Sequence, residues 1–232
     1  MKKLIITLLI FVFNVTVHAQ EFEFFSDLNF GVPTALTLRD FHDELKAQIE
    51  FENVKTIDNF YYNYGFTVGM RFNGNASVFF SNRVSGAKSS IADYSGFVRI
   101  SNELNGYTFG LRYEVVRKNF NKGNLFLGVK TLVTSSSLLL KTESNISNEI
   151  QEDTINFKSI DYGAGVGINY EYPLKFVTLR AYMDLDFYYG GKLKFKVDNL
   201  EDAYLLNNRG KKVTSGWTGI NSGLGILIPI AP

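Results

Sequence analysis

Apolar and polar residues alternate with a period of two from Glu21 to near the C-terminus, which is the pattern of β-strands with two different faces. The clearest stretch is 161–172, where large residues at even positions alternate with Gly, Asn and acidic residues at odd positions. The parity slips near Asn105-Gly106, where we expect a β-bulge. Eight segments follow this pattern, at 22–32, 61–72, 76–80, 97–115, 125–133, 161–172, 177–189 and 219–230.

The connections between these segments alternate in length. Tight turns are expected at 73–75, which begins with the strong hairpin signal Asn73-Gly74, at 118–123 and around Pro173. Longer polar stretches occupy 33–58, 86–96, 142–156 and 199–214. Short periplasmic turns and long outer loops are typical of membrane barrels, so the sequence predicts an all-β fold, an eight-stranded antiparallel up-and-down transmembrane β-barrel. In the first long loop, Leu38, Phe41, Leu45 and Ile49 recur at helical spacing and predict a short surface helix.

Volume decides which face of the strands points outward. A soluble barrel of the lipocalin type would place the apolar face inside. Eight strands carry about forty large apolar side chains, and the interior of an eight-stranded barrel is too narrow for them. The apolar face must therefore face lipid, while the Gly, Asn, Thr and charged residues of the other face fill the lumen.

Aromatic residues on the apolar face fall at two levels, as expected for girdles at the two membrane interfaces. One level lies near the short turns and the other near the long loops. The predicted girdle residues are Tyr62, Tyr64, Phe72, Tyr113, Tyr162, Tyr170, Tyr172, Phe187 and Tyr189.

The N-terminus reads as a cleaved signal peptide over residues 1–19, followed by the barrel over residues 20–232. Lys2 and Lys3 precede a ten-residue apolar stretch, and Val17 and Ala19 occupy the positions expected before a cleavage site. Removal of this segment leaves 22 basic and 23 acidic side chains, a formal charge of −1. This balance gives no sign of nucleic-acid binding. Because the chain has no cysteine, it offers neither disulfides nor a thiolate nucleophile.

The predicted inward face carries charges of both signs, and we expect them to form a paired network that fills the lumen, because an unpaired buried charge is costly. Arg83 joins them if the register of the third strand allows it. The alternatives are a narrow pore or a carrier of a small ligand. The predicted lumen residues are Glu23, Asp27, Arg71, Arg112, Glu114, Lys130, Asp161, Glu171, Arg180, Asp184 and Asp186.

Few residues suggest catalysis or cofactor binding. His42 is the one histidine beyond the signal peptide; a solvent-exposed loop position is expected for it, and a lipid-active enzyme centred on His42 is the alternative. One histidine and no cysteine predict no transition-metal site and no cofactor. Gly163-Ala-Gly-Val-Gly167 lacks the phosphate-loop pattern and is expected to make room inside a curved barrel. Lys192, Lys194 and Lys196 are expected on an extension of the seventh strand, where lipopolysaccharide phosphates are candidate ligands.

The chain resembles the PorT-like outer-membrane β-barrel family, of the OmpA-like eight-stranded class. The resemblance is carried by Ala19-Gln20, by the stretch from Phe157 to Tyr172 and by Ser222–Ile226. It implies an integral barrel without catalytic apparatus, and some relatives serve protein-secretion or gliding machinery. The sequence departs from the usual aromatic ending, since it closes with Ile228-Pro-Ile-Ala-Pro232.

These observations predict a non-enzymatic protein of the Gram-negative outer membrane. We expect a structural or accessory subunit of a secretion, assembly or envelope complex. Its expected partners are outer-membrane lipid, lipopolysaccharide and other outer-membrane or periplasmic proteins.

Overall fold

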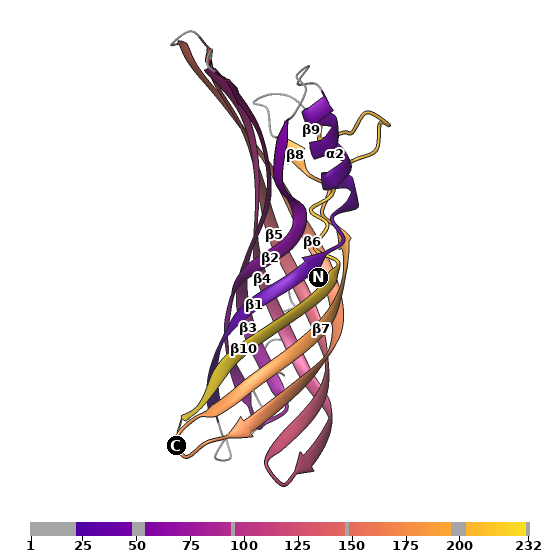
Figure 1. Cartoon of the computed structure of the whole chain (residues 1–232). Coiled ribbons are helices and arrows are strands. Elements are labelled where there is room, and N and C mark those ends of the chain that lie inside the picture. The colour runs from indigo at the N-terminus through magenta and orange to yellow at the C-terminus, as the bar shows by residue number, and fades with distance from the viewer. Residues whose placement is uncertain (1–21, 48–53, 94–95, 147–148, 196–202, 231–232) are drawn as a thin grey trace.

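Within the residues described by the computed structural model (22–47, 54–93, 96–146, 149–195 and 203–230), eight long strands close into one antiparallel barrel (Figure 1). Each strand pairs with its neighbour in the chain, β7 pairs with β10, and β10 closes the ring on β1. The predicted fold class is confirmed. The strands are β1 Phe22–Pro33, β2 Lys55–Phe72, β3 Ala76–Asp93, β4 Gly96–Phe120, β5 Gly123–Ile146, β6 Glu149–Pro173, β7 Thr178–Gly190 and β10 Gly219–Ile230.

The barrel turns its apolar face outward. Leu28 is 75% exposed and Leu111 is 54% exposed, whereas Arg112, the next residue along β4, is only 5% exposed. A surface of this composition is stable in acyl chains and not in water, because burying apolar area away from water is the main favourable term in folding. The closed ring also pairs the backbone amides within the protein, as a hydrocarbon environment requires.

The short turns lie at one end of the barrel, as predicted. The Asn73-Gly74 turn between β2 and β3 has positive φ at both residues, 48° and 71°, which matches the twist of a tight hairpin. Residues 121–122 join β4 to β5, and residues 174–177 join β6 to β7. The three turns therefore leave little structure beyond the membrane on this side.

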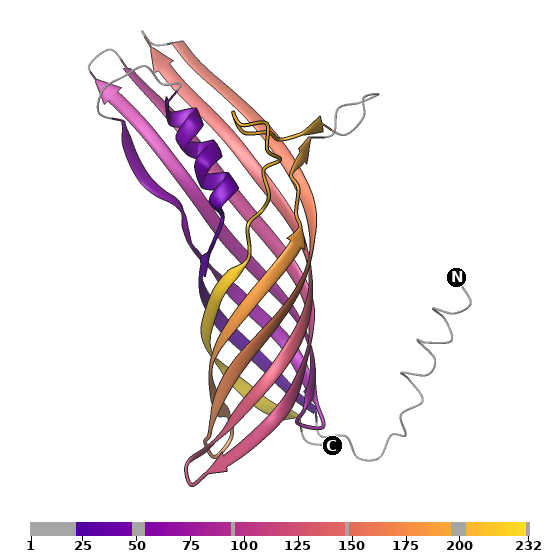
Figure 2. The ribbon, with the colours of Figure 1, turned by 90° about the vertical axis from the view of Figure 1, so that its right-hand side faces the viewer.

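Two of the four predicted outer loops are wrong, because their described residues, 86–93 and 96 in one and 142–146 and 149–156 in the other, are strands. β3 and β4 stay in register up to the pair Asp93 and Gly96, and β5 and β6 stay paired up to Ile146 and Glu149. These polar segments satisfy their backbone hydrogen bonds by pairing with each other, while the outer face of the sheet meets water. They form an outer wall, defined here as residues 86–93, 96–104, 138–146 and 149–158, which rises beyond the end of β7 (Figure 2).

The predicted bulge at Asn105-Gly106 is also wrong. β3 and β4 pair without interruption through this point, and the irregularity of β4 lies between Glu114 and Val116. What changes near residue 105 is the environment of the inward face. Ile100 and Leu104 are buried on the same face as the polar lumen residues of β4, because an apolar cluster lies above the lumen.

That apolar cluster closes the outer mouth of the barrel. It packs the predicted helix, found as α2 Leu36–Ala47, against the inner side of the wall and against residues 191–195 and 203–218, which contain the short strands β8 Lys194–Phe195 and β9 Ala203–Tyr204. We call it the outer plug, formed by Ala35, Leu38, Phe41, Phe60, Ala87, Leu104, Leu138, Phe157, Leu193, Leu205, Val213 and Trp217.

Arg39 ties α2 to the barrel. Its guanidinium donates hydrogen bonds to the carbonyls of Pro33, Asn59 and Phe60. The register of β2 shifts twice between Ile57 and Asn63, which turns Phe60 into the plug. In the described residues, no helix is long and apolar enough to cross a membrane.

Val166 on β6 tests the orientation of the barrel, because it is 51% exposed and lies between Tyr162 and Tyr170 on the same face. We predict that Val166→Arg lowers the free energy of unfolding by about 2–4 kcal/mol, since it places a charge in hydrocarbon. Denaturant unfolding in lipid vesicles measures this loss. Ile155→Arg, on the same strand but in the outer wall, is the control and should change stability little; equal losses at both positions would contradict a lipid-facing Val166.

Candidate functional site: the filled lumen and its outer plug

Ion pairs occupy the lumen at the end near the short turns. The guanidinium of Arg71 on β2 lies 2.5 Å from Glu23 Oε2 on β1 and 2.5 Å from Glu171 Oε1 on β6. It reaches Glu171 across the barrel, because β2 and β6 are not neighbouring strands. The two-pronged contact of Arg71 with Glu171 uses both carboxylate oxygens. This geometry locks the position of both side chains.

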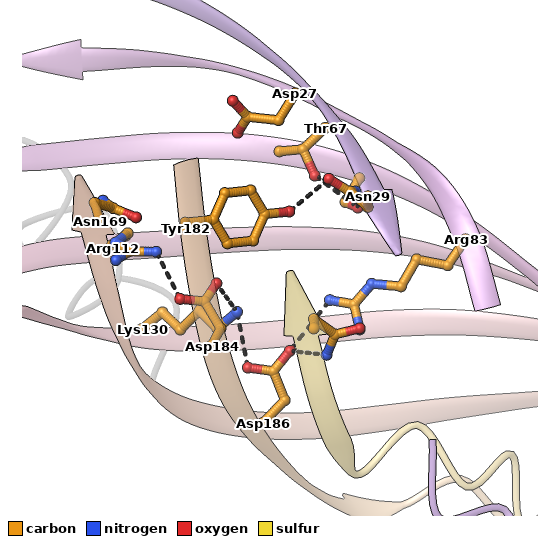
Figure 3. A network of polar contacts seen from close by, with 12 residues as sticks. Asp27, Asn29, Thr67, Arg83, Arg112, Lys130, Asn169, Tyr182, Asp184 and Asp186 are labelled. Atoms are coloured by element: carbon orange, nitrogen blue, oxygen red, sulfur yellow. Dashed lines mark hydrogen bonds and ion pairs between the residues drawn. The ribbon is translucent and has the colours of Figure 1, made fainter. Parts of the chain in front are cut away.

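The centre of the lumen is built around Asp184 and Asp186 on β7 (Figure 3). The ammonium of Lys130 lies 2.7 Å from a carboxylate oxygen of each of them. Arg112 lies 3.0 Å from Asp184 and 2.8 Å from Glu114, and Arg83 lies 3.3 Å from Asp186. All six of these side chains are at most 7% exposed. Each charge therefore has a partner of opposite sign within the barrel.

Neutral side chains fill the space that the charges leave. Tyr182 donates a hydrogen bond of 2.5 Å to Asn29, whose amide donates to Thr67 and Ser81 (Figure 3). The guanidinium of Arg180 lies 4.5 Å from the ring centroid of Phe25 and 3.7 Å from Asp27. The alternation predicts Asn and Thr side chains in the lumen, and the structure adds Ser81 and Tyr182, whose alternating positions place them on the same inward face.

Little free volume remains in this network. A cavity of about 30 Å³ lies among Phe25, Asp27, Arg112 and their neighbours, which is room for one or two water molecules. The glycines of β6 contribute to the tight fit. A Cβ added at Gly167 would lie 1.7 Å from Asp184 Oδ1, so Asp184 can occupy the lumen only because residue 167 has no side chain.

Asp161 is a predicted lumen residue that forms no ion pair with a cationic side chain among the described residues. Its carboxylate instead accepts hydrogen bonds from the hydroxyls of Ser136, Ser159 and Ser215. Ser136 in turn accepts the indole N–H of Trp217 at 2.8 Å. Asp161 thus joins the top of the polar lumen to the outer plug, and it takes no part in the ion-pair network.

The predicted girdle residues lie on the outward face. Tyr62, Tyr64, Tyr162, Phe187 and Tyr189 are 52–86% exposed near the outer end. Tyr113, Tyr170 and Tyr172 are 39–54% exposed at the other end, and Phe72 packs edge-on against Phe22 at 5.5 Å.

His42 is not the solvent-exposed loop residue that the sequence predicts. It is fully buried between α2 and the outer wall, where Nε2 lies 2.9 Å from Ser89 Oγ and Nδ1 lies 2.8 Å from the amide nitrogen of Asn102. Ser89 is also 0% exposed, and Asn102 is 3% exposed. A hydroxyl without contact to solvent cannot reach a substrate carbonyl. The three side chains hold the helix against β3 and β4, and their burial counts against the alternative of an enzyme centred on His42.

The predicted extension of strand 7 is also wrong. β7 ends at Gly190, and Gly190 and Gly191 take positive φ angles of 100° and 60°, which turn the chain away. Lys192 then pairs as an isolated bridge with Thr214, and Lys194 lies in β8 opposite Lys158 of β6. Lys196 lies outside the described residues, as does the predicted signal peptide. In the part of the chain that is described, no group of His or acidic side chains is placed to hold a metal ion.

Lys130→Met tests the lumen network. It leaves the carboxylates of Asp184, Asp186 and Glu114 with only the guanidiniums of Arg83 and Arg112, and we predict a loss of about 3–5 kcal/mol in the free energy of unfolding, since one buried negative charge is then unmatched. Denaturant titration in detergent micelles measures it.

The matched control is Lys130→Met combined with Asp184→Asn, which keeps the pairs Arg112–Glu114 and Arg83–Asp186. The double variant should lose less stability than the sum of the two single variants. Additive losses would show that the charges of Lys130 and Asp184 do not interact.

His42 makes the docking of α2 sensitive to pH. Burial lowers the pKa of His42 from its usual 6.5, while the neighbouring Asp43 raises it and Lys46 lowers it more weakly. The undocked helix therefore binds the proton more tightly than the docked one. Docking has its full strength above pH 6.5 and weakens as the pH falls below it, with at most about a tenfold rise in the undocked population per pH unit.

Hydrogen exchange of the α2 amides between pH 8 and pH 5, corrected for intrinsic rates, checks this prediction. His42→Gln is the control, because it cannot be protonated in this range and should remove the pH dependence. Protection of α2 that stays constant in the native chain would refute it.

Neither a protein-family model nor a curated protein matches the sequence. Solved outer-membrane proteins match over most of their length. The outer membrane protease OmpT from Escherichia coli has 9% identity and a TM-score of 0.32, with 91% of this chain and 96% of that chain covered. The Neisserial surface protein A has 12% identity and a TM-score of 0.29 (92% and 100% covered), and Ail of Yersinia pestis has 9% identity and a TM-score of 0.28 (90% and 96% covered). The conclusion that this chain forms an eight-stranded membrane barrel rests on its closed ring of strands and its apolar outer surface.

Proposed function

We propose that this protein is a non-conducting barrel of the outer membrane that serves as an accessory subunit and holds a partner protein at the outer surface. The filled lumen is the observation that carries the proposal. Ion pairs and hydrogen bonds occupy the barrel centre, and the outer plug lies above them. Transport would require breaking several buried ion pairs, each of which is costly to open. The outer surface is therefore the part of the molecule that remains available for a function.

The outer wall supplies a suitable surface. Four paired strands rise beyond the end of β7, braced from inside by α2 (Figures 1 and 2). Arg99, Glu143, Lys141 and Glu152 form a chain of ion pairs across it, with nitrogen–oxygen distances of 2.6–3.1 Å. Exposed pairs of this kind add little stability, but they orient side chains on an ordered surface. The wall is therefore a scaffold that keeps its shape before a partner arrives.

The edge of β6 is the part of the wall that we assign to the partner. Residues 150–157 pair with β5 on one side, and within the described residues they have no strand on the other. Ile150 and Ile155 are 76% and 44% exposed. An open strand edge with apolar side chains accepts an added strand from another protein.

The resemblance to PorT-like barrels supports the same assignment, since relatives in that family serve secretion or gliding machinery. The stretch from Phe157 to Tyr172 that carries the resemblance begins at the end of the proposed contact edge and includes the membrane-spanning part of β6. The proposal also gives a reason for a strand that extends well beyond the bilayer.

Site-specific photo-crosslinking in cells tests this function. A photoreactive residue at position 155 should give one discrete adduct with a protein, whereas the same residue at lipid-facing position 166 on β6 should not. Ile150→Lys, which places a charge on the edge, should weaken the adduct while the barrel stays folded. An adduct-free position 155, or conductance steps in planar bilayers, would overturn the proposal.

A further inference from the structure

A cavity of about 920 Å³ opens in the side of the molecule where β7 ends. β7 stops at Gly190, opposite Asp161 of β6, and the glycine turn leads the chain away, so that β6 loses its strand neighbour on that side. The start of α2 and the segment 214–218 line the opposite side. The cavity lies directly beyond Tyr162 and Tyr189, which are paired in register and belong to the predicted outer girdle. It therefore lies at the height expected for lipid head groups.

The exposed charged side chains that line this cavity are basic. Lys158, Lys192 and Lys194 all contribute to it, from β6, from the turn after β7 and from β8. Lys158 and Lys192 are exposed, and neither forms an ion pair with any described residue. The ammonium of Lys194 lies 5.2 Å from the ring centroid of Tyr204. The acidic residue in the lining is Asp161, which is 2% exposed and hydrogen-bonded to three serines. The accessible charge therefore favours an anion.

Apolar side chains also line the cavity, beside several serine and threonine hydroxyls, and continue into the lipid-facing surface. Leu36, Ile160 and Tyr189 are 67%, 58% and 86% exposed, and Trp217 forms part of the buried floor. Such exposed apolar side chains beside the exposed ammonium groups of Lys158 and Lys192 match a ligand with an anionic head and hydrocarbon chains. A volume of this size lies at the upper end of the range for sites that enclose one small molecule.

We propose that this cavity binds one phosphorylated lipid of the outer leaflet. Lys158 and Lys192 hold its phosphate, and its acyl chains lie along Ile160, Tyr162 and Tyr189 toward the membrane. A phosphate suits this pair, because each ammonium is a compact charge that can donate to any of several phosphate oxygens. The site is separate from the free edge of β6, so the proposal does not depend on the accessory function.

Native mass spectrometry of the full mature chain in detergent, with defined lipids added, tests the site. The probes are lipid A with both phosphates, the same lipid after dephosphorylation, phosphatidylglycerol and inorganic phosphate. The variant is Lys158→Gln with Lys192→Gln. Its control is Lys122→Gln with Lys175→Gln, which removes the same charge from the short turns at the other end.

We expect the first variant to weaken binding of the phosphorylated lipid about tenfold or more, and the control to leave it unchanged. Tighter binding of lipid A or of phosphatidylglycerol identifies which of them is the source of the phosphate. Equal binding of the dephosphorylated lipid, equal losses in both variants, or inorganic phosphate bound as tightly as the lipids would overturn the proposal. If the double variant does not fold, each single lysine variant gives the same comparison. In the native chain, an affinity for the lipid that does not change with salt concentration would refute the role of the lysines.

Discussion

A barrel in hydrocarbon must pair its own backbone, and the closure of β10 on β1 is the contact that satisfies this requirement. Closure with eight strands fixes how narrow the interior is. A narrow interior forces the inward side chains into contact, and the charges among them then have to be matched. The ion pairs around Lys130 and Asp184 are thus a consequence of strand number as much as of sequence.

The molecule divides along its axis into two levels with different arrangements of polar and apolar side chains. Within the membrane the outer face is apolar, and the lumen holds the ion pairs beside a small apolar cluster of Phe25, Phe79, Leu132 and Leu227. Above it, the inner face becomes apolar around Trp217 and Leu104, while the outer face of the wall meets water. Asp161 sits at the change between them, since it is hydrogen-bonded to Ser136, which also binds the indole of Trp217. Strand β4 shows both arrangements, because its inward side chain is the charged Arg112 within the membrane and the apolar Leu104 above it.

Both proposals follow from where the strands end. β7 and β10 are short and β3 to β6 are long, so the wall has an open edge and a gap at its base. The open edge suits a protein strand, and the gap, lined by Lys158, Lys192 and Tyr189, suits a lipid. In the proposed function, a plugged barrel with these two surfaces works by contact rather than by transport.

The sequence by itself determined the strand number, the turn at Asn73-Gly74, the facing of most residues and the set of charges that enter the lumen. It could do so because a period of two and a tight turn are local features, and because barrel volume leaves one orientation possible. Tertiary structure alone decided that 86–93 and 142–146 are parts of strands, since a polar stretch has the same sequence pattern in a loop and in a solvent-exposed strand until its pairing partner is known. It also decided the burial of His42 and the inward facing of Leu104, because both depend on a helix packing over the barrel mouth from far along the chain.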